Sequence, residues 1–125
     1  MEKKELAHEL DRLVSLYVRK KENRCFTCGN RLSFKKRQAG HYLSRTIRRT
    51  RWDLDNVHVQ CNKCNVELGG NLKKYRAKLD PKTRKKLHRL AELYNMGRLP
   101  EPNLTEMKIL RDFYRQLLKE MPTSK

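Results

Sequence analysis

Long apolar segments are absent from this sequence of 125 residues. It contains no run of about 18 apolar residues, the length that a membrane-spanning helix requires. The residues from Met1 to Glu5 are mostly charged and lack the apolar stretch of a secretory signal. We therefore expect a cytoplasmic protein that folds as a single domain over residues 1–125.

Acidic residues are also scarce. Only 14 Asp and Glu oppose 31 Lys and Arg, which leaves a formal net charge of +17. Charges of one sign repel one another in a compact chain, so a polyanionic partner is the natural explanation for this balance. Nucleic acid is the leading candidate for that partner, and an anionic membrane surface is the second.

Helical periodicity dominates both ends of the chain. Apolar residues recur at steps of three and four over residues 3–20 and again over 104–121, which predicts two amphipathic helices. A third helix is predicted over residues 81–95, with Asp80 as its N-cap and Pro81 at its first position. The chain should therefore be mainly helical.

The middle of the chain changes character and predicts short elements. Apolar residues suggest strands at 31–34 and 39–43, and their alternation over 52–60 predicts another strand. Residues 45–51 hold four arginines without periodicity and are expected to form an exposed loop. Short helices are expected at 62–68 and, after Asn71 as N-cap, up to residue 79. The fold class is thus α+β.

The four cysteines form two pairs with the spacing Cys-x-x-Cys. In a reducing compartment such pairs hold a metal more often than they form disulfides. Two of these knuckles can direct four thiolates at one tetrahedral ion, and a closed shell of that kind is structural. We predict a structural zinc site at Cys25, Cys28, Cys61 and Cys64; the alternative is four buried cysteines without a ligand.

Three polar residues lie inside or next to this framework: His41, Asn56 and Asn65. A neutral imidazole can deprotonate water near pH 7, and amide oxygens suit a hard cation such as Mg²⁺. We expect Asn56 to hold the His41 segment by hydrogen bonds. Together the three point to phosphodiester hydrolysis, although singly each is more often a packed histidine, a turn former or a helix cap.

Four segments carry a resemblance to a known family. They are Cys25-Phe-Thr-Cys-Gly29, Gln38-Ala-Gly-His-Tyr42, Asp55-Asn-Val-His-Val-Gln-Cys-Asn-Lys-Cys-Asn65 and Gly70-Asn-Leu-Lys-Lys-Tyr75. This central part of the chain resembles the His-Me finger, or HNH-type, nucleases, and within them the phage recombination proteins of the lambda Rap (NinG) family. The asparagine directly after the second cysteine pair is also similar to phage endonuclease VII, a resolvase of branched DNA.

The resemblance implies a fold and roles for single residues. It implies a zinc-clamped ββα-metal core at residues 23–79, between an N-terminal helix at 1–22 and C-terminal helices at 80–125. By the same resemblance His41 is the general base, Asn56 orients it, and Asn65 binds the catalytic Mg²⁺ or Mn²⁺. A phage-encoded protein acting in the cytoplasm of a bacterial host is then expected.

Gly40 departs from the family pattern. HNH nucleases often place a carboxylate directly before the base histidine as a second ligand of the catalytic metal. Either Asn65 holds the cation with water and phosphate alone, or another carboxylate replaces the missing one. Asp53, Asp55 and Glu67 are the candidates, and each is also readily explained as a cap or a solvated charge.

Basic residues follow both the candidate base and the candidate cation ligand. We expect them to contact the phosphates of DNA on either side of the site; they are Arg45, Arg48, Arg49, Arg51, Lys73, Lys74 and Arg76. Phosphate contacts do not read sequence, so selection of branched DNA by its structure is the better hypothesis. A third basic cluster at 82–89 is a candidate contact to a second duplex arm.

The sequence thus favours a Mg²⁺-dependent, structure-selective endonuclease acting on branched recombination intermediates such as Holliday junctions. Its expected partner is DNA rather than a membrane, with a homodimer and recombination proteins as further partners, because symmetric cutting needs two active sites. Two alternatives stay open. One is a zinc-containing nucleic-acid-binding module without catalysis, and the other is a site-specific HNH endonuclease.

Overall fold

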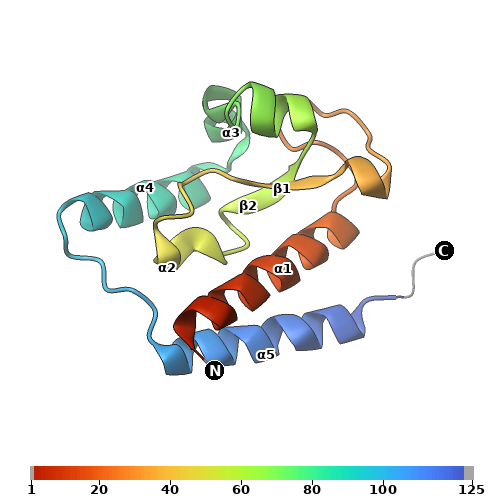
Figure 1. Ribbon diagram of the computed structural model, residues 1–125. Coiled ribbons are helices and arrows are strands. Elements are labelled where there is room, and N and C mark those ends of the chain that lie inside the picture. The colour runs from red at the N-terminus through yellow and green to blue at the C-terminus, as the bar shows by residue number, and fades with distance from the viewer. Residues whose placement is uncertain (1, 123–125) are drawn as a thin grey trace.

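A two-stranded antiparallel sheet lies between two groups of helices (Figure 1). The computed structural model describes residues 2–122. Within that range the chain is mainly helical, which confirms an α+β fold with a small sheet. The elements are α1 (Lys3–Lys21), the turn η1 (Phe34–Lys36), β1 (Gln38–His41), α2 (Arg48–Arg51), β2 (Val57–Gln60), the π-helical turn η2 (Lys63–Glu67), α3 (Leu72–Lys78), α4 (Pro81–Asn95) and α5 (Leu104–Glu120).

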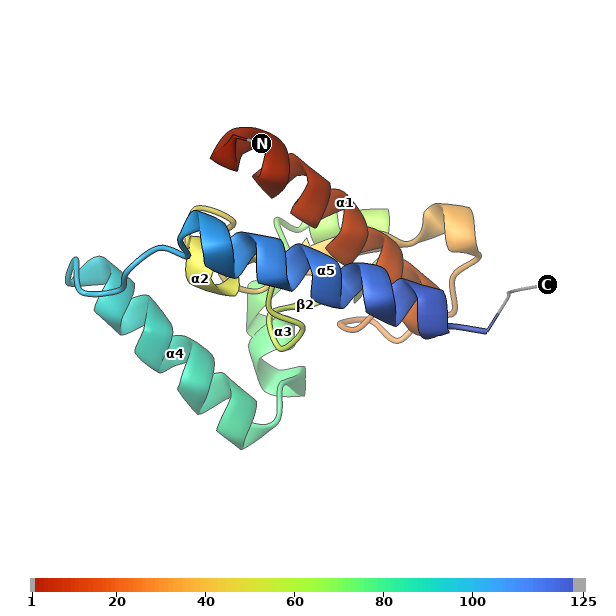
Figure 2. The same cartoon turned by 90° about the horizontal axis from the view of Figure 1, so that it is seen from below.

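Helices α1 and α5 pack side by side and form one layer of the molecule (Figures 1 and 2). Their apolar stripes meet the inner face of the sheet in the larger of two cores. Leu6, Leu10 and Val14 of α1 are buried there with Val57 and Val59 of β2. The spacing of three and four residues along α1 therefore places one continuous face of that helix in the core.

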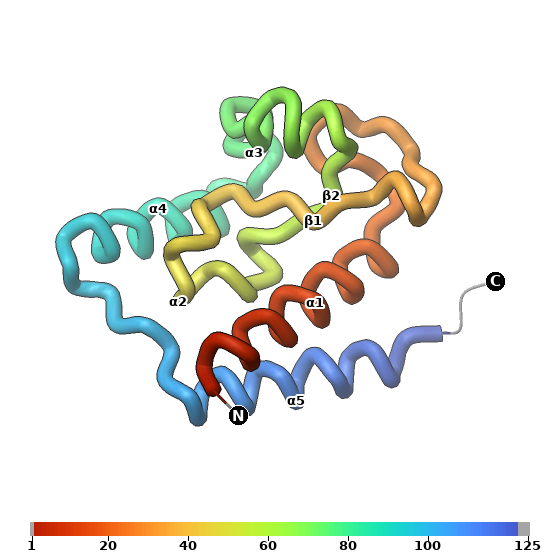
Figure 3. Tube along the Cα trace, in the orientation of Figure 1, coloured from red at the N-terminus to blue at the C-terminus, as the bar shows by residue number. Residues whose placement is uncertain are grey.

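The opposite face of the sheet carries a second, smaller core. Three residues are buried in it: Tyr75 of α3, Leu79 directly after α3, and Leu87 of α4. Phe26 and Tyr42 pack against them. The Tyr75 hydroxyl donates a hydrogen bond of 2.8 Å to the Gly40 carbonyl oxygen, which ties α3 to β1. The trace in Figure 3 shows α3 on the side of the sheet away from α5.

The three long helices begin and end close to where the sequence predicts. Asp80 caps α4, because its carboxylate accepts hydrogen bonds of 3.1 Å from the backbone amides of Lys82 and Thr83. Asn103 and Glu106 form a reciprocal capping box at the start of α5. No helix within residues 2–122 is long and apolar enough to cross a membrane.

The middle of the chain differs from the sequence-based prediction in three places. The expected strand at 31–34 is reduced to one bridge between Arg24 and Arg31, followed by η1. Part of the expected basic loop is helical, as α2, because Thr50 is buried and its hydroxyl bonds to the Ile47 carbonyl oxygen. Only residues 57–60 of the expected strand at 52–60 are extended.

The buried stripe of α1 gives a test of the larger core. Leu10→Ala should lower the free energy of unfolding by about 2–5 kcal/mol, because it removes a fully buried side chain from a packed core. Ile109→Ala on α5 is the matched control, since Ile109 is 65% exposed and its loss should change stability by about 0.5 kcal/mol or less. Urea denaturation measures both; equal losses would contradict this packing.

Candidate functional site

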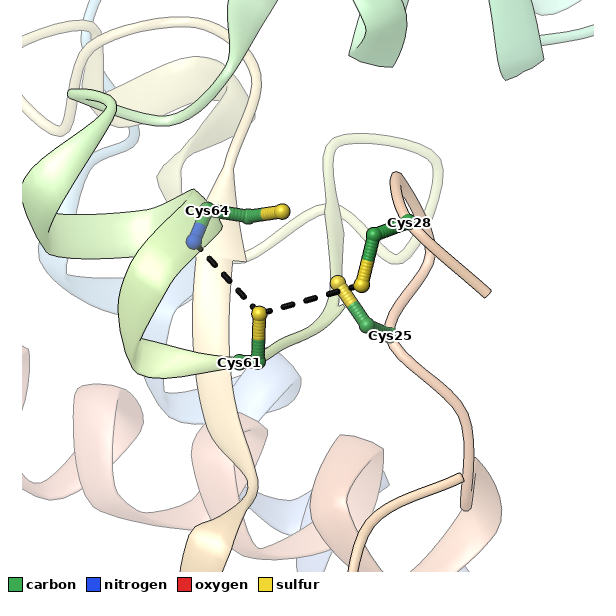
Figure 4. A group of neighbouring side chains, drawn as sticks. All are labelled: Cys25, Cys28, Cys61 and Cys64. Atoms are coloured by element: carbon green, nitrogen blue, oxygen red, sulfur yellow. Dashed lines mark hydrogen bonds between the residues drawn. The ribbon is translucent and has the colours of Figure 1, made fainter. Parts of the chain in front are cut away.

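The four cysteines come together at one end of the sheet (Figure 4). Their sulfur atoms all lie within 4.8 Å of one another, and those of Cys28 and Cys61 are 3.9 Å apart. Zinc bonds of about 2.3 Å to four sulfurs in a tetrahedron place those sulfurs about 3.8 Å apart. The cluster can therefore hold a zinc ion, and neither cysteine pair forms a disulfide.

Each knuckle is built from local hydrogen bonds. In the first, the Gly29 amide donates to the Cys25 carbonyl oxygen at 2.9 Å, and Gly29 takes the left-handed conformation that closes the turn. In the second, the Cys64 amide approaches the Cys61 sulfur at 3.4 Å. These turns aim both sulfurs of each pair at the same point in space.

Polar neighbours surround the buried sulfurs. Burial opposes ionisation of Cys25, but hydrogen bonds from the Thr27 hydroxyl and nearby amides lower its pKa to about 6. The Asn71 side chain donates to the Cys64 sulfur at 3.5 Å. Asn71 stands at the N-cap position of α3, yet its side chain makes no capping hydrogen bond, so the predicted cap serves the cluster instead.

His41 ends β1 and lies on the side of the sheet that faces α1. Its Nε2 is 2.8 Å from the Arg51 carbonyl oxygen, which can only accept a hydrogen bond. Nε2 therefore carries the proton in the neutral ring, and Nδ1 keeps its lone pair. Burial lowers the pKa of His41 below its usual value, and the Arg45 charge adds to this lowering against the hydrogen bond to Arg51.

A cavity of about 220 Å³ adjoins His41 and is lined by α1 and by the arginine-rich segment. Asp11 of α1 lines this cavity, and its carboxylate binds the basic and polar side chains around it. The Asp11 carboxylate accepts hydrogen bonds from Arg45, from two nitrogens of Arg51 and from the Trp52 indole, at 2.6 to 2.9 Å. Although burial raises the pKa of Asp11, these donors outweigh it and the net shift is downward.

Asn56 is fully buried and supports the loop that follows His41. Its Oδ1 accepts from the Leu43 amide at 2.8 Å, and its Nδ2 donates to the carbonyl oxygens of Leu43 and Thr50 at 3.3 and 3.1 Å. The Tyr42 amide also donates to the Asn56 carbonyl oxygen. These are the hydrogen bonds that the sequence predicts between Asn56 and the His41 segment.

Asn65 lies in η2, on the other side of the sheet. Its Nδ2 donates to Gln38 Oε1 at 2.8 Å, which fixes the amide and leaves Oδ1 as the free acceptor of that group. Side chains alternate along a strand, so Gln38 and His41 project to opposite faces of β1. Within residues 2–122 no hydrogen bond joins His41 to Asn65, and Asn65 does not line the cavity beside His41.

Gly40 is explained by a side chain of the adjacent strand, that of Gln60, which pairs in the sheet with Gln38. A Cβ at position 40 would stand 1.9 Å from Gln60 Oε1, so any other residue would collide with this buried amide. Gln60 Nε2 donates to the Thr27 hydroxyl and the Gly70 carbonyl oxygen, at 3.1 and 2.8 Å. Gln60 Oε1 has no partner among the described residues, and it occupies the place where a carboxylate at position 40 would begin.

The three carboxylates considered as replacements lie elsewhere. Asp53 and Asp55 both form ion pairs of 2.8 Å with Lys86 of α4. Glu67 is exposed and lies 3.5 Å from Asn62 Nδ2. None of the three contacts His41 or Asn65 through a hydrogen bond in the described part of the chain.

The arginines after His41 divide into two groups. Arg49 bonds to the Pro100 carbonyl oxygen and to Glu106 of α5, and Arg51 is paired with Asp11, so both connect elements of the fold. Arg45 also pairs with Asp11 but is more exposed, and the Arg48 side chain forms no hydrogen bond within residues 2–122. The basic residues of α3 are exposed; they are Lys73, Lys74, Arg76 and Lys78.

Two further histidines have clear structural partners. His58 pairs with Glu22 at 2.9 Å and stacks on Phe26 with ring centres 4.0 Å apart, so its packing role is supported. His88 of α4 is half-buried, and its Nε2 forms a hydrogen bond of 2.7 Å with the Tyr42 hydroxyl. This contact ties α4 to the loop after His41.

Sequence reasoning missed Asp11, Gln38 and Gln60. Asp11 lies between apolar positions of an amphipathic helix, where a solvated charge is the ordinary interpretation. Gln60 alternates with Val59 on a strand, and the only signal was a glycine, Gly40, on the neighbouring strand. The contacts of all three join residues far apart in the chain, and local patterns do not encode such contacts.

The fold and the cysteine cluster define a small, strongly basic α+β protein in which, within residues 2–122, four cysteines are placed to hold a metal ion. A family model described as Bacteriophage Lambda NinG protein matches residues 1–123. The chain therefore belongs to the NinG family of bacteriophage proteins.

Three relatives carry the name Protein ninG, from Escherichia phage 933W, Enterobacteria phage VT2-Sa and Escherichia phage lambda. Each is 28% identical over 116 residues, which cover 90% of this chain. The same alignments cover 56%, 56% and 55% of the relatives, so the chain spans about half of their length. No solved structure matches the chain significantly.

The cysteine cluster gives the prediction of this section. Cys61→Ser should release zinc and unfold the chain, because structural zinc contributes about 10–16 kcal/mol in small domains, as much as a whole fold. Lys63→Ser, an exposed neighbour, should keep both zinc and fold. Metal analysis and circular dichroism measure the two effects; a folded wild-type protein without zinc would contradict the assignment.

Proposed function

We propose that the chain is a Mg²⁺-dependent endonuclease that cuts branched DNA, such as Holliday junctions, during recombination. The observation that carries this proposal is the hydrogen bonding and burial of the His41 ring, which favour its neutral form with the proton on Nε2. Its Nε2 is held by the Arg51 carbonyl oxygen, so the unprotonated Nδ1 is the proton acceptor of the ring. Burial keeps the ring neutral at pH 7, and a neutral imidazole can act as a general base on water.

The cavity beside His41 has the charge to receive a phosphate. Arg45 and Arg51 line it, and both are held there by Asp11. Guanidinium groups recognise phosphate oxygens with paired hydrogen bonds. A phosphate that entered the cavity would lie beside the base, with Arg45 the more exposed of the two arginines.

Asn65 is the residue that would hold the catalytic cation. Its amide is fixed by Gln38 and leaves a free oxygen, the donor type that Mg²⁺ prefers. The residues present supply few other ligands, which suits an ion that keeps several waters. When bound, the ion would neutralise charge on the scissile phosphate and the leaving oxygen. Asn65 and His41 lie on opposite sides of β1, so the proposal requires a rearrangement on DNA binding that brings both to one scissile phosphate.

Cutting a four-way junction symmetrically needs two active sites, so we include a homodimer in the proposal. Ile109 and Phe113 on α5 are exposed apolar side chains that offer a surface for a second copy. Recombination proteins are proposed as further partners. The longer relatives have room for contacts that this chain does not contain.

A zinc-containing DNA-binding module without catalysis is the second candidate function. It is favoured by the separation of His41 from Asn65 and by the glycine at position 40, which leaves no carboxylate beside the base. The exposed lysines of α3 would serve either function. Cleavage assays separate the two.

His41→Ala should slow cleavage of a labelled four-way junction in Mg²⁺ by about 10²- to 10⁴-fold, because a general base is lost while phosphate contacts remain. Asn65→Ala should also abolish cleavage, through loss of the cation. His8→Ala is the matched control, since His8 is exposed on α1 and should leave the rate unchanged. A His41→Ala protein that cuts at the parental rate would refute the assignment of the base.

The pH dependence of cleavage should reflect the lowered pKa of His41. The neutral ring is the active form, so the single-turnover rate should hold through the usual histidine pKa of about 6.5 and fall only at lower pH. The charged groups facing the ring are Asp11 from α1, with Arg45 and Arg51. A rate that already falls as the pH drops from 8 to 7 would contradict a buried neutral base.

DNA binding should weaken steeply with salt and show little preference for sequence. Replacing Lys73 and Lys74 together by Ala should flatten the slope of log K against log salt by roughly 1.8, about 0.9 for each phosphate contact on duplex DNA. Replacing Lys108 and Lys119 of α5 removes the same charge and should flatten it less. Equal effects of the two pairs would indicate that net charge alone drives binding.

A further inference from the structure

An apolar cluster stands exposed next to the candidate cation ligand. Val66, Leu68 and Leu72 are 61%, 50% and 47% exposed, and all three lie within one short stretch that joins η2 to α3. Asn65 directly precedes this stretch. Exposed apolar side chains concentrated in one short stretch of a basic chain indicate a surface that another molecule covers.

The backbone under this cluster is held firmly. The Leu68 amide donates to the Lys63 carbonyl oxygen at 2.8 Å, and the Gly70 amide donates to the Cys64 carbonyl oxygen at 2.9 Å. Gly69, Gly70 and Asn71 all have positive φ, and for Asn71 this conformation is strained. A rigid turn beside the cysteine cluster therefore presents the apolar side chains outward. The strained conformation of Asn71 lowers the stability of the folded chain somewhat.

The surroundings of the cluster are basic. Lys63, Lys73 and Lys74 are exposed on either side of it, and Glu67 is the one acidic residue within 62–78. This charge pattern fits a polyanion at the edges and an apolar surface at the centre. DNA offers that combination where base pairs are unstacked, because base faces are then accessible between two phosphate chains.

We propose that Val66, Leu68 and Leu72 form an apolar wedge that packs against unstacked bases at the branch point of a DNA junction. The wedge rests on the proposed function, since it would place Asn65 at the strand to be cut. Proteins that kink DNA insert apolar side chains between base steps in the same way, while basic residues hold the flanking phosphates. The wedge explains a preference for branched over linear DNA without any reading of sequence.

The test uses binding without cleavage. A four-way junction and a linear duplex of the same sequence carry 2-aminopurine, whose fluorescence rises on unstacking, at the branch point or the equivalent position. Wild-type protein without Mg²⁺ should raise the signal of the junction. Val66→Ser/Leu68→Ser should lose this rise and bind the junction roughly tenfold or more weakly, because two apolar side chains no longer become buried. Its affinity for the linear duplex should stay unchanged.

Tyr94→Ser/Met96→Ser is the matched control, with side chains 39% and 56% exposed at the C-terminal end of α4. It should behave as wild type. Zinc content and circular dichroism verify folding, and the single change Val66→Ser replaces the double variant if that one loses zinc. The proposal is wrong if Val66→Ser/Leu68→Ser keeps the fluorescence rise. It is also wrong if this double change, but not the control, dissociates a dimer of the protein.

The assay also separates the wedge from the endonuclease. Protein that raises the fluorescence but never cuts would overturn the endonuclease and keep the wedge. Protein that cuts junctions without any rise would keep the endonuclease and overturn the wedge.

Discussion

Convergence of two distant knuckles on one point is the constraint on which the rest of this structure depends. The first knuckle lies beside β2, where the Phe26 amide donates to the Val59 carbonyl oxygen, and the second begins directly after β2 at Cys61. The cluster therefore anchors one end of a sheet of only two strands, which is marginal by itself. With a metal bound, both strands, the loop after His41 and the turn before α3 share one rigid support.

A second support comes from outside the central segment. Asp11 of α1 holds Arg45, Arg51 and Trp52, and Arg51 in turn orients His41 through its carbonyl oxygen. The candidate base is thus positioned from the N-terminal helix as well as from Asn56. This makes α1 more than a cover for the core, because loss of its carboxylate would free two arginines beside His41.

Local chemistry explains which features the sequence could predict. The long helices follow from apolar spacing and from caps such as Asp80 and Asn103, and the convergence of the four cysteines follows from their spacing. The support that Asn56 gives to the loop after His41 was predicted as well. The contacts of Asp11 and the amide of Gln60 above Gly40 were not, because each joins elements whose relative placement only the folded chain defines. The separation of His41 from Asn65 across β1 is of the same kind.

Membership of the NinG family places the chain among phage proteins, and its geometry separates the four cysteines that could hold zinc from Asn65, the proposed ligand of the cation for cutting. The most direct measurement incubates zinc-loaded protein with a labelled four-way junction while only the Mg²⁺ concentration is varied. The account predicts no cutting without Mg²⁺ and cutting that saturates as Mg²⁺ is added, with zinc retained throughout. Cutting supported by the bound zinc alone, or none at any Mg²⁺ concentration, would contradict it.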